Sequence, residues 1–168
     1  MRRAKSLDNG LGTRIGFMGD FAFGPVTVAG AFSTEEITTS EDETTTNLGA
    51  VYKMGAFTFR GGYSTTETDD PGGKFKSPML LLGVQYGFSP TLNGRFGYYD
   101  LKFEQGGFEA KTKTFIVALD YYLSKRTTAY VEFDRVTLDD NFQAIALSVD
   151  GARLDGSTAI GVGIAHSF

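Results

Sequence analysis

A two-residue alternation of apolar and polar side chains runs through nearly the whole chain and limits what it can fold into. In residues 114–123, Phe115, Val117, Leu119 and Tyr121 share one parity. Successive side chains of a strand point to opposite faces, so the pattern predicts β-strands with one apolar face. Nine segments show it: 13–24, 26–33, 47–54, 57–64, 80–88, 92–99, 114–123, 128–135 and 157–168. The 3.6-residue period of a helix is missing over any helix length, and we expect almost no helix.

The two faces of these predicted strands differ in charge. We expect the apolar face to carry no charge, and the other face is padded with Gly, Ala, Ser and Thr. The charged residues on that polar face are Arg14, Asp20, Lys53, Arg60, Arg95, Asp120, Glu132 and Asp134. In a membrane barrel this face lines the lumen, so the eight are candidate pore-lining residues, although a soluble sheet would expose them to solvent. The basic members would bias a pore towards anions, and the acidic members would form their counterpart.

The connections between the predicted strands alternate between two lengths. Short turns fall at 23–26, 53–57, 87–92 and 123–127. We expect long polar loops at 34–46, 65–76, about 101–112 and about 136–157. Short turns at one end and long loops at the other are typical of an outer-membrane barrel, and segments of 8 to 12 residues are near the length that crosses a bilayer when tilted.

Aromatic residues of the apolar face gather near the ends of the predicted strands. Next to the short turns or the terminus lie Phe21, Phe23, Tyr52, Phe57, Tyr86, Phe88, Tyr121 and Phe168. Nearer the long loops lie Phe32, Tyr63, Tyr98, Phe115 and Phe133. Two aromatic girdles around an aliphatic band suit the two lipid–water interfaces, which favours a transmembrane antiparallel β-barrel as the fold.

Composition excludes several functional classes. The sequence holds no Cys and one His, His166, which removes most zinc sites, and we predict no metal site. A net charge of −4 gives no reason to expect a nucleic-acid partner. The acidic loop at 34–46 lacks the alternating ligands of a calcium loop, and we interpret it as solvated.

Three motifs resemble the Gram-negative porin family, most closely the general porins of β-proteobacteria. The segment "YYLSKRTTAYVEF" (121–133) is similar to that family's YxLSKRTxxY strand–turn–strand unit. The ending "GVGIAHSF" (161–168) resembles its terminal GLRH-x-F, and "FAFGPVTVAGAFS" (21–33) resembles its FGPxxVGAAY hairpins. The resemblance covers residues 13–168, with Ala165 and Ser167 where the family has arginines.

This resemblance implies a 16-stranded trimeric channel in the bacterial outer membrane that passes small hydrophilic solutes and ions by diffusion. Such a channel has no cofactor and is not an enzyme, and we expect neither a cofactor nor an enzymatic activity here. It implies outer-membrane lipid and lipopolysaccharide, a homotrimer and the barrel-assembly machinery as partners. The terminal aromatic of the family is the signal that this machinery reads. The corresponding interface and assembly residues are Gly163, His166, Phe168, Tyr121, Tyr86 and Tyr52.

The resemblance extends over about half the length of such a porin. We expect one partial barrel domain over 1–168, with 1–12 irregular and without the apolar core of a secretory signal. The first and last predicted strands both end on the short-turn side, so pairing them would create a parallel seam. Bacterial single-chain barrels have even strand numbers, so we expect the C-terminal portion of a porin, about nine strands.

Two alternatives stay open at this point. A small closed outer-membrane barrel could act as an adhesin or structural anchor without a pore, although its lumen would be plugged by large side chains. The small Gly, Ala, Ser and Thr residues of the polar face argue against that packing. A soluble lipocalin-like or sandwich domain is the weaker alternative.

Overall fold

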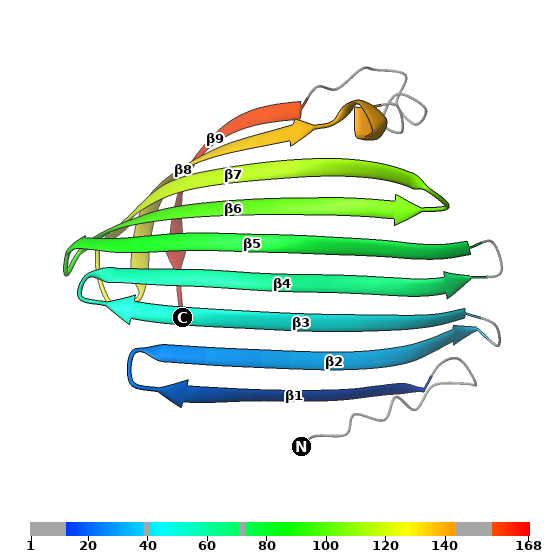
Figure 1. Cartoon of the computed structure of the whole chain (residues 1–168). Helices are drawn as coiled ribbons and strands as arrows, with labels where there is room; N and C mark the ends of the chain where they lie inside the picture. The colour runs from blue at the N-terminus through cyan, green and yellow to red at the C-terminus, as the bar shows by residue number, and fades with distance from the viewer. Residues whose placement is uncertain (1–12, 39–40, 71–72, 144–155) are drawn as a thin grey trace.

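The computed structural model describes residues 13–38, 41–70, 73–143 and 156–168. They form a nine-stranded antiparallel sheet in which each strand pairs with the next along the chain (Figure 1). The strands are β1 (Arg14–Phe23), β2 (Val26–Thr38), β3 (Glu41–Met54), β4 (Phe57–Asp70), β5 (Gly73–Ser89), β6 (Leu92–Gln105), β7 (Phe108–Tyr122), β8 (Thr127–Leu138) and β9 (Gly156–His166). The predicted all-β antiparallel fold is confirmed, with all nine predicted segments present as strands.

The short connections fall where the sequence predicts them. The turn between β1 and β2 uses Gly24 at φ 54°, and the turn between β3 and β4 uses Gly55 at φ 58°. Positive φ is cheap for glycine alone, and such turns match the twist of the flanking strands. Between β5 and β6, the Ser89 hydroxyl accepts hydrogen bonds from the backbone N–H groups of Thr91 and Leu92 at 3.2 and 3.1 Å.

The prediction of long polar loops is wrong for most of the length of three of them, 34–46, 65–76 and about 101–112. Strands β2 and β3 continue to Thr38 and from Glu41, and β6 and β7 are joined across Gly106 and Gly107 alone. Threonines fill the extensions, and Thr45 and Thr66 hydroxyls on neighbouring strands lie 3.3 Å apart. Beyond the lipid neither face of a strand needs to be apolar, so β-branched threonine pairs extend the ladder into water.

The connection after β8 opens with a helical turn over residues 140–143. Asp139 caps it: its carboxylate accepts the Phe142 N–H at 2.7 Å, and its backbone carbonyl accepts the Gln143 N–H at 2.9 Å. The same carboxylate accepts the Lys111 N–H at 2.9 Å, which ties the turn to β7. The candidate C-terminal portion of this loop, 144–155, and the predicted irregular segment 1–12 lie outside the described residues.

The sheet is a single layer with almost no core. In the described residues only Ala110, Ala118 and Asp120 are buried, whereas Val162 and Ile160 are 79 % and 74 % exposed. A soluble fold buries its apolar face against a second layer, so this exposure contradicts the soluble alternative. No helix of the described residues combines the length and apolarity that crossing a membrane would take.

The register places the apolar parities of all nine strands on one common face, called here the outer face. Phe17 opposes Phe32, and Tyr98 opposes Phe115. Aromatic rings meet across neighbouring strands, with the ring centres of Phe57 and Tyr86 4.5 Å apart. Such cross-strand pairs stabilise the sheet and fix its register, because a slip of one residue would turn every apolar side chain to the other face.

Candidate functional site

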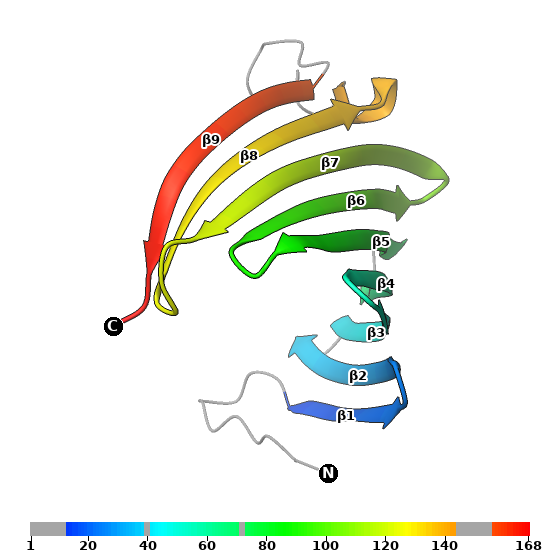
Figure 2. The same cartoon turned by 90° about the vertical axis from the view of Figure 1, so that its left-hand side faces the viewer.

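The face opposite the apolar one, called here the inner face, holds every candidate pore-lining residue. Cross-strand partners share a face, and the registers of all eight strand pairs connect these residues without a change of parity. The residues on it are Arg14, Asp20, Lys53, Arg60, Arg95, Asp120, Glu132 and Asp134. Figure 2 shows that the sheet is curved rather than flat, so one of its faces is concave and the other is convex.

The strongest polar contact of the inner face joins β6 to β7 and β8. The Arg95 guanidinium donates to Asp120 through Nε at 2.5 Å and Nη2 at 2.8 Å, a two-pronged pair. Its Nη2 also lies 3.8 Å from Glu132 on β8. Side chains two strands apart thus meet above Ala118, which is 2 % exposed. This closeness across β7 indicates that the inner face is the concave one.

The basic residues of the inner face differ in their partners. Arg14 lies 3.5 Å from Glu35 and donates to the Ser33 hydroxyl at 3.3 Å. Arg60 donates to the Gln85 side-chain carbonyl at 3.2 Å. Within the described segments neither Arg60 nor Lys53 has a carboxylate at ion-pair distance. The positive charge is therefore balanced on β1 and β6 but unbalanced on β3 and β4.

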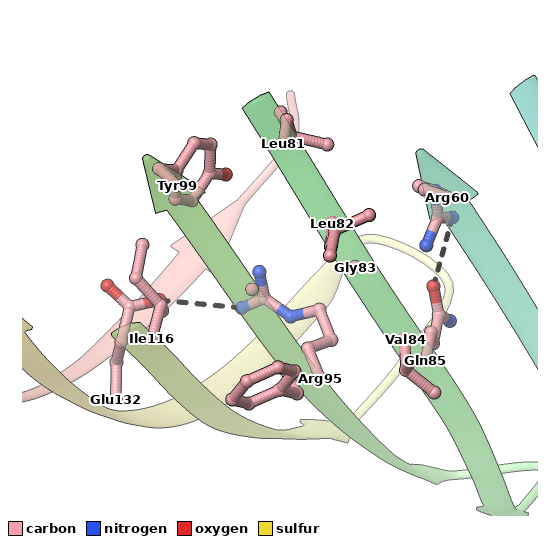
Figure 3. A pocket seen from close by; sticks show the side chains of 12 residues that line it. Arg60, Leu81, Leu82, Gly83, Val84, Gln85, Arg95, Tyr99, Ile116 and Glu132 are labelled. Carbon is pink, nitrogen blue, oxygen red and sulfur yellow. Dashed lines mark hydrogen bonds and ion pairs between the residues drawn. The ribbon is translucent and has the colours of Figure 1, made fainter. Parts of the chain in front are cut away.

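A hollow of about 420 Å³ lies on the inner face between the side chains of Arg60 and Arg95. Figure 3 shows the Arg60–Gln85 pair on one side and the Arg95–Glu132 pair on the other, with Tyr99 and Leu81 beyond them. Sequence reasoning missed Gln85 and the hollow, because both depend on the cross-strand register and not on the parity of a single segment.

Apolar side chains cover the inner face nearer the long connections. The ring of Phe142, from the helical turn after β8, lies 5.6 Å from that of Phe103. Phe103 is also 6.1 Å from Phe75, its neighbour on β5. The start of the β8–β9 connection is therefore folded onto the wall at this end of the sheet.

The predicted interface residues lie near the short turns. Tyr52, Tyr86 and Tyr121 are on the outer face, and the Tyr86 ring meets that of Phe88 edge-on at 4.8 Å. His166 Nδ1 lies 2.9 Å from the Thr127 hydroxyl, and its ring packs edge-on against Phe168 at 5.0 Å.

Gly163 has a packing role that the sequence did not reveal. It lies on the inner face of β9, where a Cβ atom would come within 2.6 Å of the Tyr130 hydroxyl oxygen and 2.7 Å of its Cζ. The Tyr130 ring therefore lies directly over Gly163, and a larger residue at this position would have to displace it.

Four cations lie on the outer face, which the sequence predicted to be free of charge. Lys102 and Lys111 belong to the segment predicted as a loop, Lys113 lies next to it, and Arg135 ends the predicted strand 128–135 on its apolar parity. Lys102 faces Lys111 directly across β6 and β7, and Lys113 is two residues further along β7. Arg135, on β8, faces Phe115 and donates to the Thr158 hydroxyl at 2.8 Å. These four residues form the outer cation group: Arg135 lies level with the aromatic girdle, and the three lysines lie at or beyond it on the side of the long connections.

In the part of the chain that the structure describes, no group of three or more His, Asp or Glu side chains could hold a metal ion. The acidic residues of the inner face bind arginine or stand apart. Asp134 Oδ1, for example, is buried and accepts no hydrogen bond from the described residues.

Comparison with known structures shows the same fold. An outer-membrane expressed OmpT of Vibrio cholerae aligns with a TM-score of 0.76 at 12 % identity over 92 % of this chain and 56 % of its own. An anion-selective porin from Comamonas acidovorans aligns with a TM-score of 0.74 at 22 % identity over 93 % of this chain and 49 % of its own. The chain spans about half the length of these structures. No curated protein sequence matches.

A family model described as Gram-negative porin matches residues 3–141. This match covers most of the chain and includes strands β1 to β8. Together with the outer-membrane fold of the structural neighbours, it locates the protein in the bacterial outer membrane. The chain belongs to the Gram-negative porin family.

Proposed function

We propose that these nine strands form part of the wall of a water-filled channel for passive diffusion of small hydrophilic solutes and ions. The observation that carries the proposal is the sorting of side chains: eight charged residues on one face and an uncharged apolar band on the other. A closed barrel satisfies all backbone hydrogen bonds in lipid. A lumen lined by Gly, Ala, Ser and Thr leaves room for water, in contrast to a small plugged barrel.

The strand directions support a larger barrel. In an antiparallel sheet, β1 and β9 run the same way because both have odd numbers. Joining them would give a parallel seam, so closure calls for an odd number of additional strands. We infer a 16-stranded barrel of which the nine strands are the C-terminal portion, in keeping with the half-length alignment to the structural neighbours.

The inner charges support a field across the lumen. Cations without carboxylate partners, Lys53 and Arg60, belong to β3 and β4, whereas Asp120, Glu132 and Asp134 belong to β7 and β8. Charges of opposite sign on separate walls orient and guide ionic solutes. The channel works in this proposal by diffusion alone, with no cofactor and no enzymatic turnover.

We infer three partners. Family membership supports a homotrimer and the barrel-assembly machinery as partners, the latter reading β9 and the aromatic Phe168 after it. The outer cation group supports contacts with phosphate groups of lipopolysaccharide. Lys111 has Glu109 as an ion-pair partner and Lys113 faces Asp100, whereas Lys102, which faces Lys111, has no carboxylate at ion-pair distance in the described segments. The outer-face girdle of Tyr98, Phe115 and Phe133 marks the depth at which such headgroups would begin.

Planar bilayer recording tests the channel. Protein purified from outer membranes as a folded trimer is added to one side of a bilayer in KCl. We expect stepwise conductance increments that scale with the salt concentration, and none from heat-denatured protein. A folded trimer that gives no increments would refute the channel and favour the anchor without a pore.

A further inference from the structure

The hollow on the inner face follows from one row of the sheet. Arg60 on β4 pairs with Gly83 on β5, Gly83 pairs with Gly97 on β6, and Gly97 pairs with Ile116 on β7. Two facing glycines give the middle of this row no side chains of its own, and the Tyr99 ring lies over Gly97, where a Cβ would meet its Cε2 at 3.3 Å. Since neighbouring strands are about 4.8 Å apart, the row from Arg60 to Ile116 spans about 14 Å.

The borders of the hollow differ in chemistry. Leu81 and Tyr99 border it towards the long connections, and Gln85 and Arg95 border it towards the short turns (Figure 3). One long side is therefore apolar and aromatic, while the other offers hydrogen-bond donors. A flat molecule with an apolar edge and one anionic end matches this arrangement.

Charge decides where the anionic end would lie. Arg95 is engaged by Asp120 at 2.5 Å and by Glu132 at 3.8 Å, so its charge is already balanced. Arg60 has only the neutral Gln85 as a partner among the described residues. The Ile116 end lies near Glu132, which would repel a second negative group. The hollow therefore favours a monoanion held at Arg60.

Backbone crowding does not require glycine at position 83. A Cβ atom there would meet the Arg60 Cβ at 3.6 Å, an ordinary contact. Glycine is otherwise unfavourable in a strand interior, and its presence there often marks a close approach by a ligand or another backbone. Strand packing therefore does not explain the glycine at position 83, and the space above it is open to a ligand.

We propose that this hollow is a binding subsite for small organic monoanions with a flat apolar body, the aryl carboxylates. The carboxylate pairs with the Arg60 guanidinium and the ring lies over Gly83, against Leu81 and against the Tyr99 ring that covers Gly97. The inference deepens the proposed channel, on which its transport role rests: solutes of this class bind on their way through the lumen.

Equilibrium dialysis on the purified trimer in detergent tests binding independently of conduction, with 3-phenylpropionate as the probe. Propionate keeps the charge without the ring, and 3-phenylpropanol keeps the ring without the charge. We expect each to bind at least tenfold more weakly than the probe, since either lost contact is worth about 1.4 kcal/mol or more. Equal binding of propionate would overturn the proposal.

Variants assign the binding to the hollow. Arg60→Gln should weaken binding of the probe about tenfold. Lys53→Gln removes another inner-face cation, which lies outside the hollow, and should leave binding unchanged. Gly83→Leu should abolish binding by filling the floor, and Gly83→Ala should only weaken it. Equal losses in Arg60→Gln and Lys53→Gln would reduce the effect to general electrostatics and overturn the site.

Bilayer recording separates this subsite from the channel itself. We expect 3-phenylpropionate to reduce the current of the native channel and not that of Gly83→Leu. Normal current without any such reduction overturns the subsite and leaves the channel intact, while absent current with specific binding overturns the channel alone. If the thiol of Gly83→Cys in a conducting channel resists small methanethiosulfonates, protein fills the hollow and the proposal fails.

Discussion

Arg95 and Asp120 form a two-pronged ion pair on neighbouring strands of the inner face, with Asp120 only 7 % exposed. The pair holds the side chain of Arg95 across β7, where it reaches Glu132. The described part of the sheet has no second layer, so these polar side chains are fixed by one another: Arg95 is held by Asp120 and Glu132.

The first prediction concerns this pair. Asp120→Asn keeps the shape of the side chain and removes its charge, so Arg95 loses its main anionic partner. We expect a loss of about 1–3 kcal/mol of stability and a reversal potential shifted towards anions. Heat-dependent gel migration and bilayer recording in a KCl gradient measure the two effects.

Asp20→Asn is the matched control. Asp20 is an exposed inner-face carboxylate with no ion pair among the described residues, so the variant should shift the reversal potential at most and leave stability unchanged. If both variants lowered the unfolding temperature equally, the Arg95–Asp120 pair would have no special role.

Much of this architecture can be read from the sequence because the strand period is two. Leu119 and Asp120 differ by one position and must face opposite sides of any strand. The faces of all eight charged candidates follow from that parity alone. Strand existence and the short turns were predictable for the same reason, with glycine and proline as additional marks.

Features that depend on the lipid–water boundary or on the cross-strand register were not predictable from the sequence. The threonines around Thr45 and Thr66 carry no apolar parity, so the strand extensions beyond the lipid were taken for loops. Arg135 lies two residues after Phe133, the last apolar residue of its segment, and shares its parity, so it belongs to the outer face although its charge does not fit an apolar face. Gly83 and Gly97 form a hollow only because β5 and β6 bring them opposite each other.

The second prediction tests the contact between the last two strands. Gly163→Ala places a Cβ about 2.6 Å from the Tyr130 hydroxyl oxygen, closer than real contacts permit. We expect β9 to pair less well with β8 and the unfolding temperature to fall. Gly161→Ala is the control on the same face of β9, because nothing lies within 4 Å of its Cβ. A second substitution, Tyr130→Ala, should restore Gly163→Ala; failure of that rescue would argue against the clash.

The third prediction tests the assignment of the two faces. Ile160 and Ala159 are neighbours on β9, the first on the outer and the second on the inner face. Ile160 pairs with the girdle residue Phe133, whereas the next outer-face residue, Val162, pairs with Val131 inside the girdle. Val162→Lys therefore places a charge towards lipid and should cost about 2–4 kcal/mol near the bilayer midplane. Ala159→Lys points into the lumen beside Asp134, its cross-strand partner, and should fold normally. Urea unfolding in lipid vesicles measures both, and the reverse order would mean that the faces are exchanged.

The fourth prediction is a pH dependence at the outer ends of β4 and β5. Lys74 and Lys76 each lie 2.9 Å from the Glu67 carboxylate, beyond the apolar band. Hydrogen bonds from Lys76 and then Lys74 lower the pKa of Glu67 below its ordinary value of 4.5. A lowered folded-state pKa means that the stabilisation is complete above about 4.5 and is lost as the pH falls through the folded value.

Amide hydrogen exchange, corrected for the intrinsic effect of pH, measures this change. We expect protection around residues 66–69 and 74–77 to fall between pH 6 and pH 3, and Glu67→Gln to show the low protection already at pH 6. Glu104→Gln is the control, because Glu104 lies on the same face without an ion pair in the described segments. Both variants remove one negative charge. An equal loss of protection in Glu104→Gln would therefore show that the pH dependence comes from overall charge and not from the ion pairs of Glu67.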